Sequence, residues 1–155
     1  MAVELRVAPA DGDDGVRLTA AMVEEMRALY DGLDLDADHM PAAGPAELGP
    51  PDGAFVVGYG PDGAAVCSGG IKRFADDVAE IKRMYVVPEA RGRGVARALL
   101  ARLEDEARAL GYTTVRLDTG DRQPGAQRLY ARAGYRAVGN YNGNPAAAWF
   151  GEKHL

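Results

Sequence analysis

The sequence predicts one α+β domain over residues 1–155, in which a mixed, mostly antiparallel sheet of about seven strands is flanked by about four helices. Three observations support this prediction. A Pro-Asp-Gly turn at residues 61–63 separates two apolar segments, as in a β-hairpin. Residues 95–110 carry apolar side chains at helical spacing. After Gly111, short β-branched segments alternate with a helical one to the end of the chain.

The part of the chain before the hairpin predicts a strand, a helix and a long loop. The strand is expected at residues 4–8 and the helix at residues 16–33, where apolar residues recur every three or four positions behind two acids that favour a helix start. Residues 32–53 contain four prolines and four glycines, which predicts a loop with one short helix at residues 42–48. Long loops in compact domains are often binding loops.

The hairpin and the segments after it complete the expected sheet. The hairpin strands and the next strand form an antiparallel meander, and an amphipathic helix then ends at Gly111. The expected elements of this part are strands at 54–59, 64–74 and 78–87, a helix at 95–110, a strand at 113–119, a helix at 125–133 and strands at 135–138 and 146–153.

Composition argues against several classes of function. A net charge of −5 speaks against a nucleic-acid partner. The chain has no apolar run of membrane-spanning length and no basic-then-apolar leader, so we expect no membrane association. A single cysteine cannot form an intramolecular disulfide, so we expect a reducing cytoplasm as the location. Cys67 is the single cysteine, stands in an apolar strand, and is expected to be a small core side chain rather than a catalytic thiol. His39 and His154 show no ligand spacing, so no metal is expected. The sequence does not distinguish a monomer from a homodimer.

The charge is unevenly distributed along the chain. Residues 1–53 carry 3 basic and 12 acidic side chains, whereas residues 54–155 carry 15 basic and 11 acidic ones. A basic part suits a polyanionic cofactor, and an acidic part suits a cationic substrate. The alternative for the acids is that they only keep a solvated surface soluble.

Residues 91–97, Arg-Gly-Arg-Gly-Val-Ala-Arg, connect a strand to a helix and predict an anion site. The first N–H groups of a helix lack internal partners and carry the positive end of its dipole. Gly92 and Gly94 let the backbone approach phosphate oxygens, and the three arginines supply charge. The run lacks the third glycine of a dinucleotide fingerprint and the Gly-Lys-Ser/Thr of a P-loop.

Two motifs carry a resemblance to a known family. The run Arg91-x-x-Gly94-x-Ala96, after a strand that ends in Val-x-Pro, resembles the R/Q-x-x-G-x-G/A signature of the GCN5-related N-acetyltransferase (GNAT) superfamily. Residues 129–135, Leu-Tyr-Ala-Arg-Ala-Gly-Tyr, resemble its second signature, L-Y-x-x-x-G-F/Y. The order of expected elements is also that of the superfamily. The ending at residues 141–150 is similar to the tail of a bacterial subgroup.

The resemblance implies acetyl-CoA as cosubstrate, with its pyrophosphate on the glycine loop. At Gln123, seven residues before the tyrosine of the second signature, many members have an asparagine that contacts the pantetheine. The amide of Val86 is a candidate partner of the pantetheine and of the thioester carbonyl, because Pro88 ends ordinary strand pairing just beyond it. The expected cofactor-binding set is Met84, Val86, Arg91, Gly92, Arg93, Gly94, Val95, Ala96, Arg97 and Gln123.

Two residues are candidates for proton transfer. In the second signature the tyrosine hydroxyl lies near the thioester sulfur, so Tyr130 is expected to protonate the departing thiolate; the alternative is a tyrosine that packs its helix on the core. Glu80 lies eleven residues before Arg91, the interval at which histone-acetylating members place their general base. The alternative for Glu80 is a strand carboxylate paired with Lys72 or Lys82.

The expected function is transfer of an acetyl group from acetyl-CoA to a primary amine of a small molecule or peptide, by direct attack on the thioester. In this fold the first helix and the loop after it face the acceptor, so the acidic first third of the chain favours a cationic amine. The candidate acceptor residues are Asp34, Asp36, Asp38, Tyr141 and Asn142. A non-catalytic acyl-CoA sensor and a nucleotide-binding regulator are alternatives, and the sequence shows no base-reading or metal-holding pattern for the second.

Overall fold

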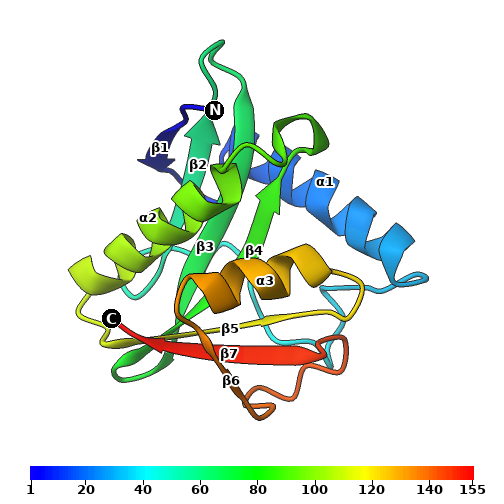
Figure 1. Cartoon of the computed structure of the whole chain (residues 1–155), viewed down its shortest axis with the longest axis vertical. Helices are drawn as coiled ribbons and strands as arrows, with labels where there is room; N and C mark the ends of the chain where they lie inside the picture. The colour runs from blue at the N-terminus through cyan, green and yellow to red at the C-terminus, as the bar shows by residue number, and fades with distance from the viewer.

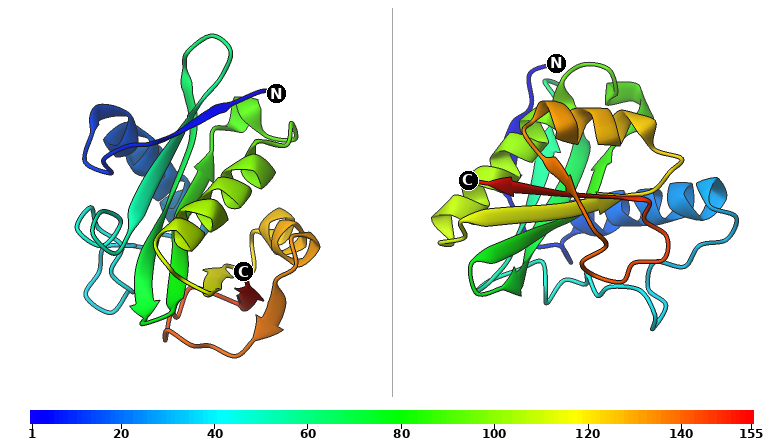
Figure 2. Two further views of the ribbon diagram at one scale, coloured as in Figure 1. Left: turned by 90° about the vertical axis from the view of Figure 1, so that its left-hand side faces the viewer. Right: turned by 60° about the horizontal axis from the view of Figure 1, so that its bottom comes forward.

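The computed structural model describes residues 1–155 and shows one seven-stranded sheet with helices on both faces (Figure 1). The strand order is β1-β2-β3-β4-β5-β7-β6. Helices α2 and α3 cover one face and α1 covers the other, as the left view of Figure 2 shows. The elements are β1 (Glu4–Val7), α1 (Asp13–Leu29), β2 (Ala54–Tyr59), β3 (Ala65–Ala75), β4 (Val78–Val86), α2 (Val95–Ala109), β5 (Thr114–Thr119), α3 (Pro124–Arg132), β6 (Arg136–Val138) and β7 (Trp149–His154).

All neighbouring strands pair antiparallel except β4 and β5, which run parallel. A parallel pair needs a long crossover between its strands, and α2 supplies it. The prediction of a mixed, mostly antiparallel sheet is therefore confirmed.

Alternating side chains of β2 divide the core between the two faces of the sheet. Ala54 and Val56 belong to the larger apolar cluster, under α2, whereas Phe55 and Val57 belong to the cluster under α1. Because helices cover both faces, β2 is apolar at nearly every position. Cys67 is fully buried in the larger cluster, and burial raises the pKa of its thiol to about 11, as suits a small core side chain.

The parallel pairing of β4 with β5 is short. Val78–Glu80 pairs with Thr114–Arg116, and beyond these residues the two strands diverge. The sheet therefore opens in its middle, between β4 on one side and β5 on the other.

A bulge in β4 lies beside this opening. Gly69 of β3 faces two residues of β4, Arg83 and Met84, instead of one. Arg83 has a φ of 58°, in the region that non-glycine residues rarely adopt. A Cβ on Gly69 would lie 3.3 Å from the Cα of Met84, so glycine at this position leaves room for the bulge.

The expected short helix at residues 42–48 is absent, so the structure has three α-helices and one 3₁₀ turn (Pro88–Ala90) rather than about four helices. The backbone N–H of Leu48 donates to the carbonyl of Gly44 at 3.0 Å, which closes a single helical turn. The consecutive prolines that follow cannot donate backbone hydrogen bonds and stop further helix.

Three boundaries differ from the prediction by more than one residue. Helix α1 begins at Asp13, so the two acids lie inside its first turn, and it ends before Asp31 and Gly32, which both have positive φ. Strand β7 begins only at Trp149, because asparagine side chains accept hydrogen bonds from the backbone in the preceding segment and hold it in turns. None of the helices combines the length and the apolar composition needed to cross a membrane.

Candidate active site

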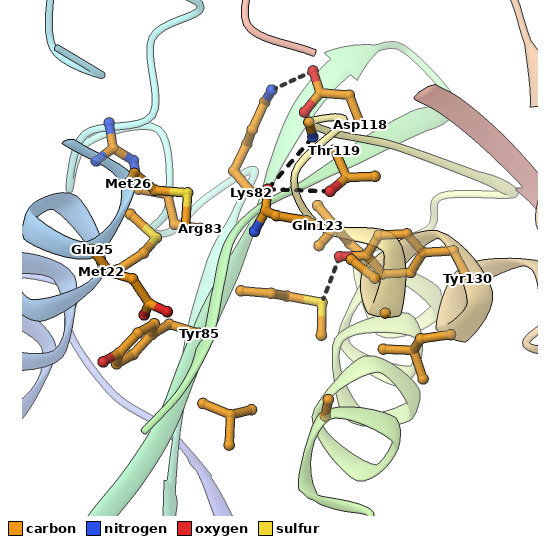
Figure 3. Close-up of a pocket in the computed structure, with 18 of the residues that line it drawn as sticks. Met22, Glu25, Met26, Lys82, Arg83, Tyr85, Asp118, Thr119, Gln123 and Tyr130 are labelled. Carbon is orange, nitrogen blue, oxygen red and sulfur yellow. Dashed lines mark hydrogen bonds and ion pairs between the residues drawn. The ribbon is translucent and has the colours of Figure 1, made fainter. Parts of the chain in front are cut away.

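The opening between β4 and β5 forms a cavity of about 1150 Å³ (Figure 3). Its walls come from α1, the loop at residues 33–43, β4, the glycine loop at residues 92–97, the end of β5 and α3. The cavity thus reaches from the helix N-terminus of the predicted anion site to the loop between α1 and β2. Seven of its lining side chains are basic and two are acidic.

The glycine loop has the geometry of an anion site. Gly92 and Gly94 have φ of 73° and 82°, and a Cβ at either position would point into open space. None of the backbone N–H groups of residues 92–97 donates to another group of the protein, since α2 begins at Val95 and Gly94 gives no side-chain cap. These donors are free for phosphate oxygens at the positive end of the helix dipole.

The three arginines of residues 91–97 lie in different places. Arg97 is exposed and lines the cavity beside the free N–H groups. Arg91 also lines it, but its Nη2 lies 2.7 Å from Glu25 of α1 and its Nε donates to the carbonyl of Val86 at 2.9 Å, so it connects three elements. Arg93 does not line the cavity, and its carbonyl accepts a hydrogen bond from the N-terminal ammonium of Met1 at 3.0 Å.

The backbone of Val86 faces the opening. The N–H of Val87 donates to Val66 at 2.9 Å, and because neighbouring residues in an antiparallel pair point in opposite directions, the N–H and C=O of Val86 point away from β3. On that side β5 has already diverged, so no strand occupies the position. The Val86 N–H is therefore available to a ligand in the cavity.

Tyr130 of α3 is 7% exposed and lines the cavity. Its hydroxyl lies 3.8 Å from the sulfur of Met84, and its ring stacks on Trp149 with centroids 6.1 Å apart. Burial, with a smaller contribution from Asp118, raises the pKa of Tyr130 above the ordinary value for a phenol. The side chain therefore both packs α3 onto the core and presents a protonated hydroxyl at the cavity (Figure 3).

Gln123 precedes α3 and lines the cavity, with its amide oxygen turned toward the neighbouring backbone and side chains. That oxygen lies 3.3 Å from the hydroxyl of Thr119 and 3.5 Å from that of Tyr30. A Cβ on Gly120 would overlap the Tyr30 hydroxyl, so glycine at this position lets the Tyr30 side chain lie against this turn. Gln123 thus helps to connect α1 with the start of α3.

Glu80 lies behind the cavity wall rather than in it. Its side chain is 1% exposed, and one carboxylate oxygen accepts hydrogen bonds from the hydroxyl of Tyr141 at 2.6 Å and from Asn142 at 2.8 Å. The Nζ of Lys82 lies 3.3 Å from the same oxygen, so the structure contains the ion pair of the alternative interpretation. Lys72 instead donates to a backbone carbonyl of the 33–43 loop.

Asp118, near the end of β5, is the carboxylate that this polar network presents to the cavity. Its Oδ2 accepts hydrogen bonds from Lys82 at 3.2 Å, Asn142 at 2.7 Å and Asn144 at 3.1 Å. Figure 3 shows Lys82 reaching Asp118 across the opening. Sequence reasoning missed this residue, and the available signal was a single acid near the carboxyl end of a β-branched strand.

The three aspartates expected at the acceptor side do not line the cavity. Asp34 accepts a hydrogen bond from its own loop backbone, and Asp36 forms an ion pair with Arg83 at 3.0 Å. The loop buries apolar side chains against the cavity and leaves its carboxylates toward solvent. The expected acidic rim is therefore not formed, and the loop residues at the wall are Leu33, Leu35, Met40, Pro41 and Ala43.

Comparisons with known proteins agree with the fold and the two motifs. The sequence profile of the acetyltransferase (GNAT) family matches residues 19–135. The chain is 35% identical to an IAA acetyltransferase of Azospirillum brasilense, over 86% of this chain and 88% of that one. It is 31% identical to an N-acetyltransferase of Schizosaccharomyces pombe, over 88% and 83% of the two chains.

Solved structures show the same fold. A GNAT-family acetyltransferase of Staphylococcus aureus has a TM-score of 0.78 at 15% identity, over 99% of both chains. The PaiA N-acetyltransferase of Thermoplasma acidophilum, in complex with coenzyme A, has a TM-score of 0.73 at 16% identity, over 100% of both chains. With the profile match and the relatives above, these similarities show that the chain belongs to the acetyltransferase (GNAT) family and is an acyltransferase.

Proposed function

We propose that the protein uses acetyl-CoA to acetylate a primary amine of a small molecule or peptide, by direct attack of the amine on the thioester. The observation that carries this proposal is that the unpaired N–H groups of residues 92–97 and the hydroxyl of Tyr130 open into one continuous cavity. A phosphate-binding end and a proton donor in the same cavity are what a CoA thioester requires.

The cavity has room for the pyrophosphate and the pantetheine arm of an extended CoA molecule. The pyrophosphate would bind the N–H groups at the start of α2, with Arg97 beside it. The pantetheine arm would lie along the unpaired edge of β4, where the N–H of Val86 would donate to it in the place of a neighbouring strand. The Thermoplasma acidophilum protein of the same fold was solved in complex with coenzyme A, which supports CoA as the ligand.

The proposed reaction forms the C–N bond of an amide and breaks the C–S bond of the thioester. The hydroxyl of Tyr130, which burial keeps protonated, would give its proton to the departing thiolate. The amine must lose a proton. Of the two carboxylates that line the cavity, Glu25 is paired with Arg91, and Asp118 would receive the proton, directly or through water. Glu80 would act only through Lys82 or Tyr141, which contact it from the cavity side and from the β7 side.

The test is a thiol-release assay with acetyl-CoA and a library of amines, in which Tyr130→Phe is compared with wild type. We expect wild-type turnover with at least one amine, and a fall in kcat of about 10-fold or more in Tyr130→Phe with little change in CoA affinity. Tyr59→Phe is the matched control, because Tyr59 lies outside the cavity and donates to Asp14 at the surface. CoA binding without thiol release from any amine would instead indicate an acyl-CoA sensor.

A further inference from the structure

Arg83 of β4 is a cation in the cavity that the proposed reaction does not use. We propose that the acceptor carries, besides its amine, an anionic group such as a carboxylate or a phosphonate, and that this group binds the guanidinium of Arg83. The inference rests on the proposed function and names the class of acceptor.

Arg83 is almost entirely buried, but most of its donors are unused. Its side chain is 9% exposed and lines the cavity. The guanidinium has five N–H donors, and the protein satisfies it with one bond, from Nη2 to Asp36 at 3.0 Å. A buried guanidinium with free donors has a strong preference for a planar anion that can accept two hydrogen bonds at once.

The one partner of Arg83 is easily displaced. The side chain of Asp36 is 76% exposed and belongs to the loop between α1 and β2. Water can solvate the Asp36 carboxylate fully once the ion pair with Arg83 is broken, so replacing Asp36 by a ligand anion costs little free energy. Asp36 therefore occupies the position where an anion binds when no acceptor is present.

The position of Arg83 places this anion on the acceptor side. Figure 3 shows two neighbours in β4 that diverge, Lys82 toward Asp118 and Arg83 toward Met26 of α1. Met26 of α1 and Asp36 of the loop at residues 33–43 lie beside Arg83 (Figure 3), whereas the glycine loop follows the carboxyl end of β4. An anion on Arg83 would thus share the cavity with the acetyl group without competing for the phosphate site.

The backbone of Arg83 adopts a conformation that is energetically unfavourable for a non-glycine residue. Its φ of 58° is unusual for a residue with a long side chain, and the bulge opposite Gly69 holds it there. Without the extra residue, side chains of β4 would alternate strictly between the two faces. With the bulge, Ile81 and Met84 both pack with the apolar cluster under α2. The two residues between them, Lys82 and Arg83, both line the cavity.

The experiment compares matched pairs of acceptors that differ only in the anion. ω-Amino carboxylates and ω-aminoalkylphosphonates of increasing chain length are each paired with the neutral amide or the plain alkylamine. We expect kcat/KM to be at least about tenfold higher for the anionic member at one chain length, and Arg83→Gln to reduce the ratio of the two kcat/KM values to about one. Arg83→Lys keeps the charge without the planar fork and should retain part of the preference.

Two controls separate this site from general charge effects. Arg17→Gln removes an exposed arginine of α1 outside the cavity and should leave the preference intact. Asp36→Asn should lower KM for the anionic acceptor, because the competing carboxylate is gone, whereas Asp38→Asn should not. Equal kcat/KM for anionic and neutral acceptors in wild type would overturn the inference, and so would a preference that survives Arg83→Gln.

Binding distinguishes failure of the inference from failure of the proposed function. Calorimetric titration of the same ω-amino acids into the protein with CoA present measures anion recognition without turnover. Arg83-dependent binding with no acetylation of any amine would uphold the anion site and overturn the proposed reaction. Turnover of neutral and anionic amines alike would uphold the reaction and overturn the anion site.

Discussion

Placing a carboxylate at the start of α2 tests the glycine loop most directly. Gly94→Glu introduces a side chain at a position with φ of 82°, where a Cβ meets open space, and directs negative charge toward the unpaired N–H groups. Gly111 at the other end of α2 is a matched position, with φ of 92° and open space around its Cβ, but it lies outside the cavity. The pair separates loss of the anion site from loss of stability.

The two substitutions should differ in stability in a known direction. Each forces a non-glycine residue into left-handed geometry, which costs about 1–2 kcal/mol. A carboxylate gains about 0.3–1 kcal/mol at a helix N-terminus and loses a similar amount at a C-terminus. We therefore expect Gly94→Glu to be destabilised by about 1 kcal/mol and Gly111→Glu by about 2 kcal/mol, with Tm falling by roughly 2–4 °C for each kcal/mol.

CoA affinity should change in the opposite order. Gly94→Glu should raise the Kd for CoA at least about tenfold, equivalent to roughly 1.4 kcal/mol, because its carboxylate repels the pyrophosphate and occupies its donors. Gly111→Glu should leave the Kd unchanged. Isothermal titration of CoA and urea unfolding of both variants provide the measurements. A Kd for Gly94→Glu equal to that of Gly111→Glu would refute the assignment of the phosphate site to this loop.

Two further predictions concern tyrosine hydroxyls. Tyr141→Phe removes a hydrogen-bond donor from the fully buried Glu80 and should lower the free energy of unfolding by about 1–3 kcal/mol. Tyr59→Phe is the control: its carboxylate partner Asp14 is partly exposed, so the free energy of unfolding should change by less than about 1 kcal/mol. Equal effects of the two variants in urea unfolding would contradict the importance of burial. Burial, together with neighbouring carboxylates, raises the pKa of Tyr130, Tyr135 and Tyr141 in the folded state, so the unfolded chain releases these protons first. The associated stability is fully present below about pH 10 and is lost as the pH rises above it, and a free energy of unfolding that stays constant from pH 9 to about pH 11 would contradict this.

Most of the fold could be predicted because its signals are local. The Pro-Asp-Gly turn fixes the β2–β3 hairpin, and apolar spacing fixes α2 to within one residue of its observed end. Residues 42–48 failed because they form only one turn, which carries the same short-range pattern as a helix. The glycine loop was also predictable, since helix starts and glycines act through their own backbone.

The acceptor side could not be predicted in the same way, because it depends on contacts between distant segments. Asp36 and Arg83 are 47 residues apart in sequence and form an ion pair, so a count of acids along the chain does not reveal that this one is neutralised. Asp118 reaches the cavity only because β5 diverges from β4. The prediction of Glu80 as general base rests on an interval in the sequence, and such an interval does not indicate whether a carboxylate faces the cavity or lies behind its wall.

The short parallel pairing of β4 with β5 leaves a weakly paired boundary, here called the seam, between the two parts of the sheet. Three residue pairs join a four-stranded half to a three-stranded half, whereas β5 and β7 alone share six. Few backbone hydrogen bonds therefore resist separation of the halves, and the first sub-global opening should follow this line. A ligand bound across the seam adds to folding stability by mass action, about 2.7 kcal/mol at one hundred times its Kd. Binding of a ligand in the cavity should therefore slow backbone amide hydrogen exchange in β4 and β5 together.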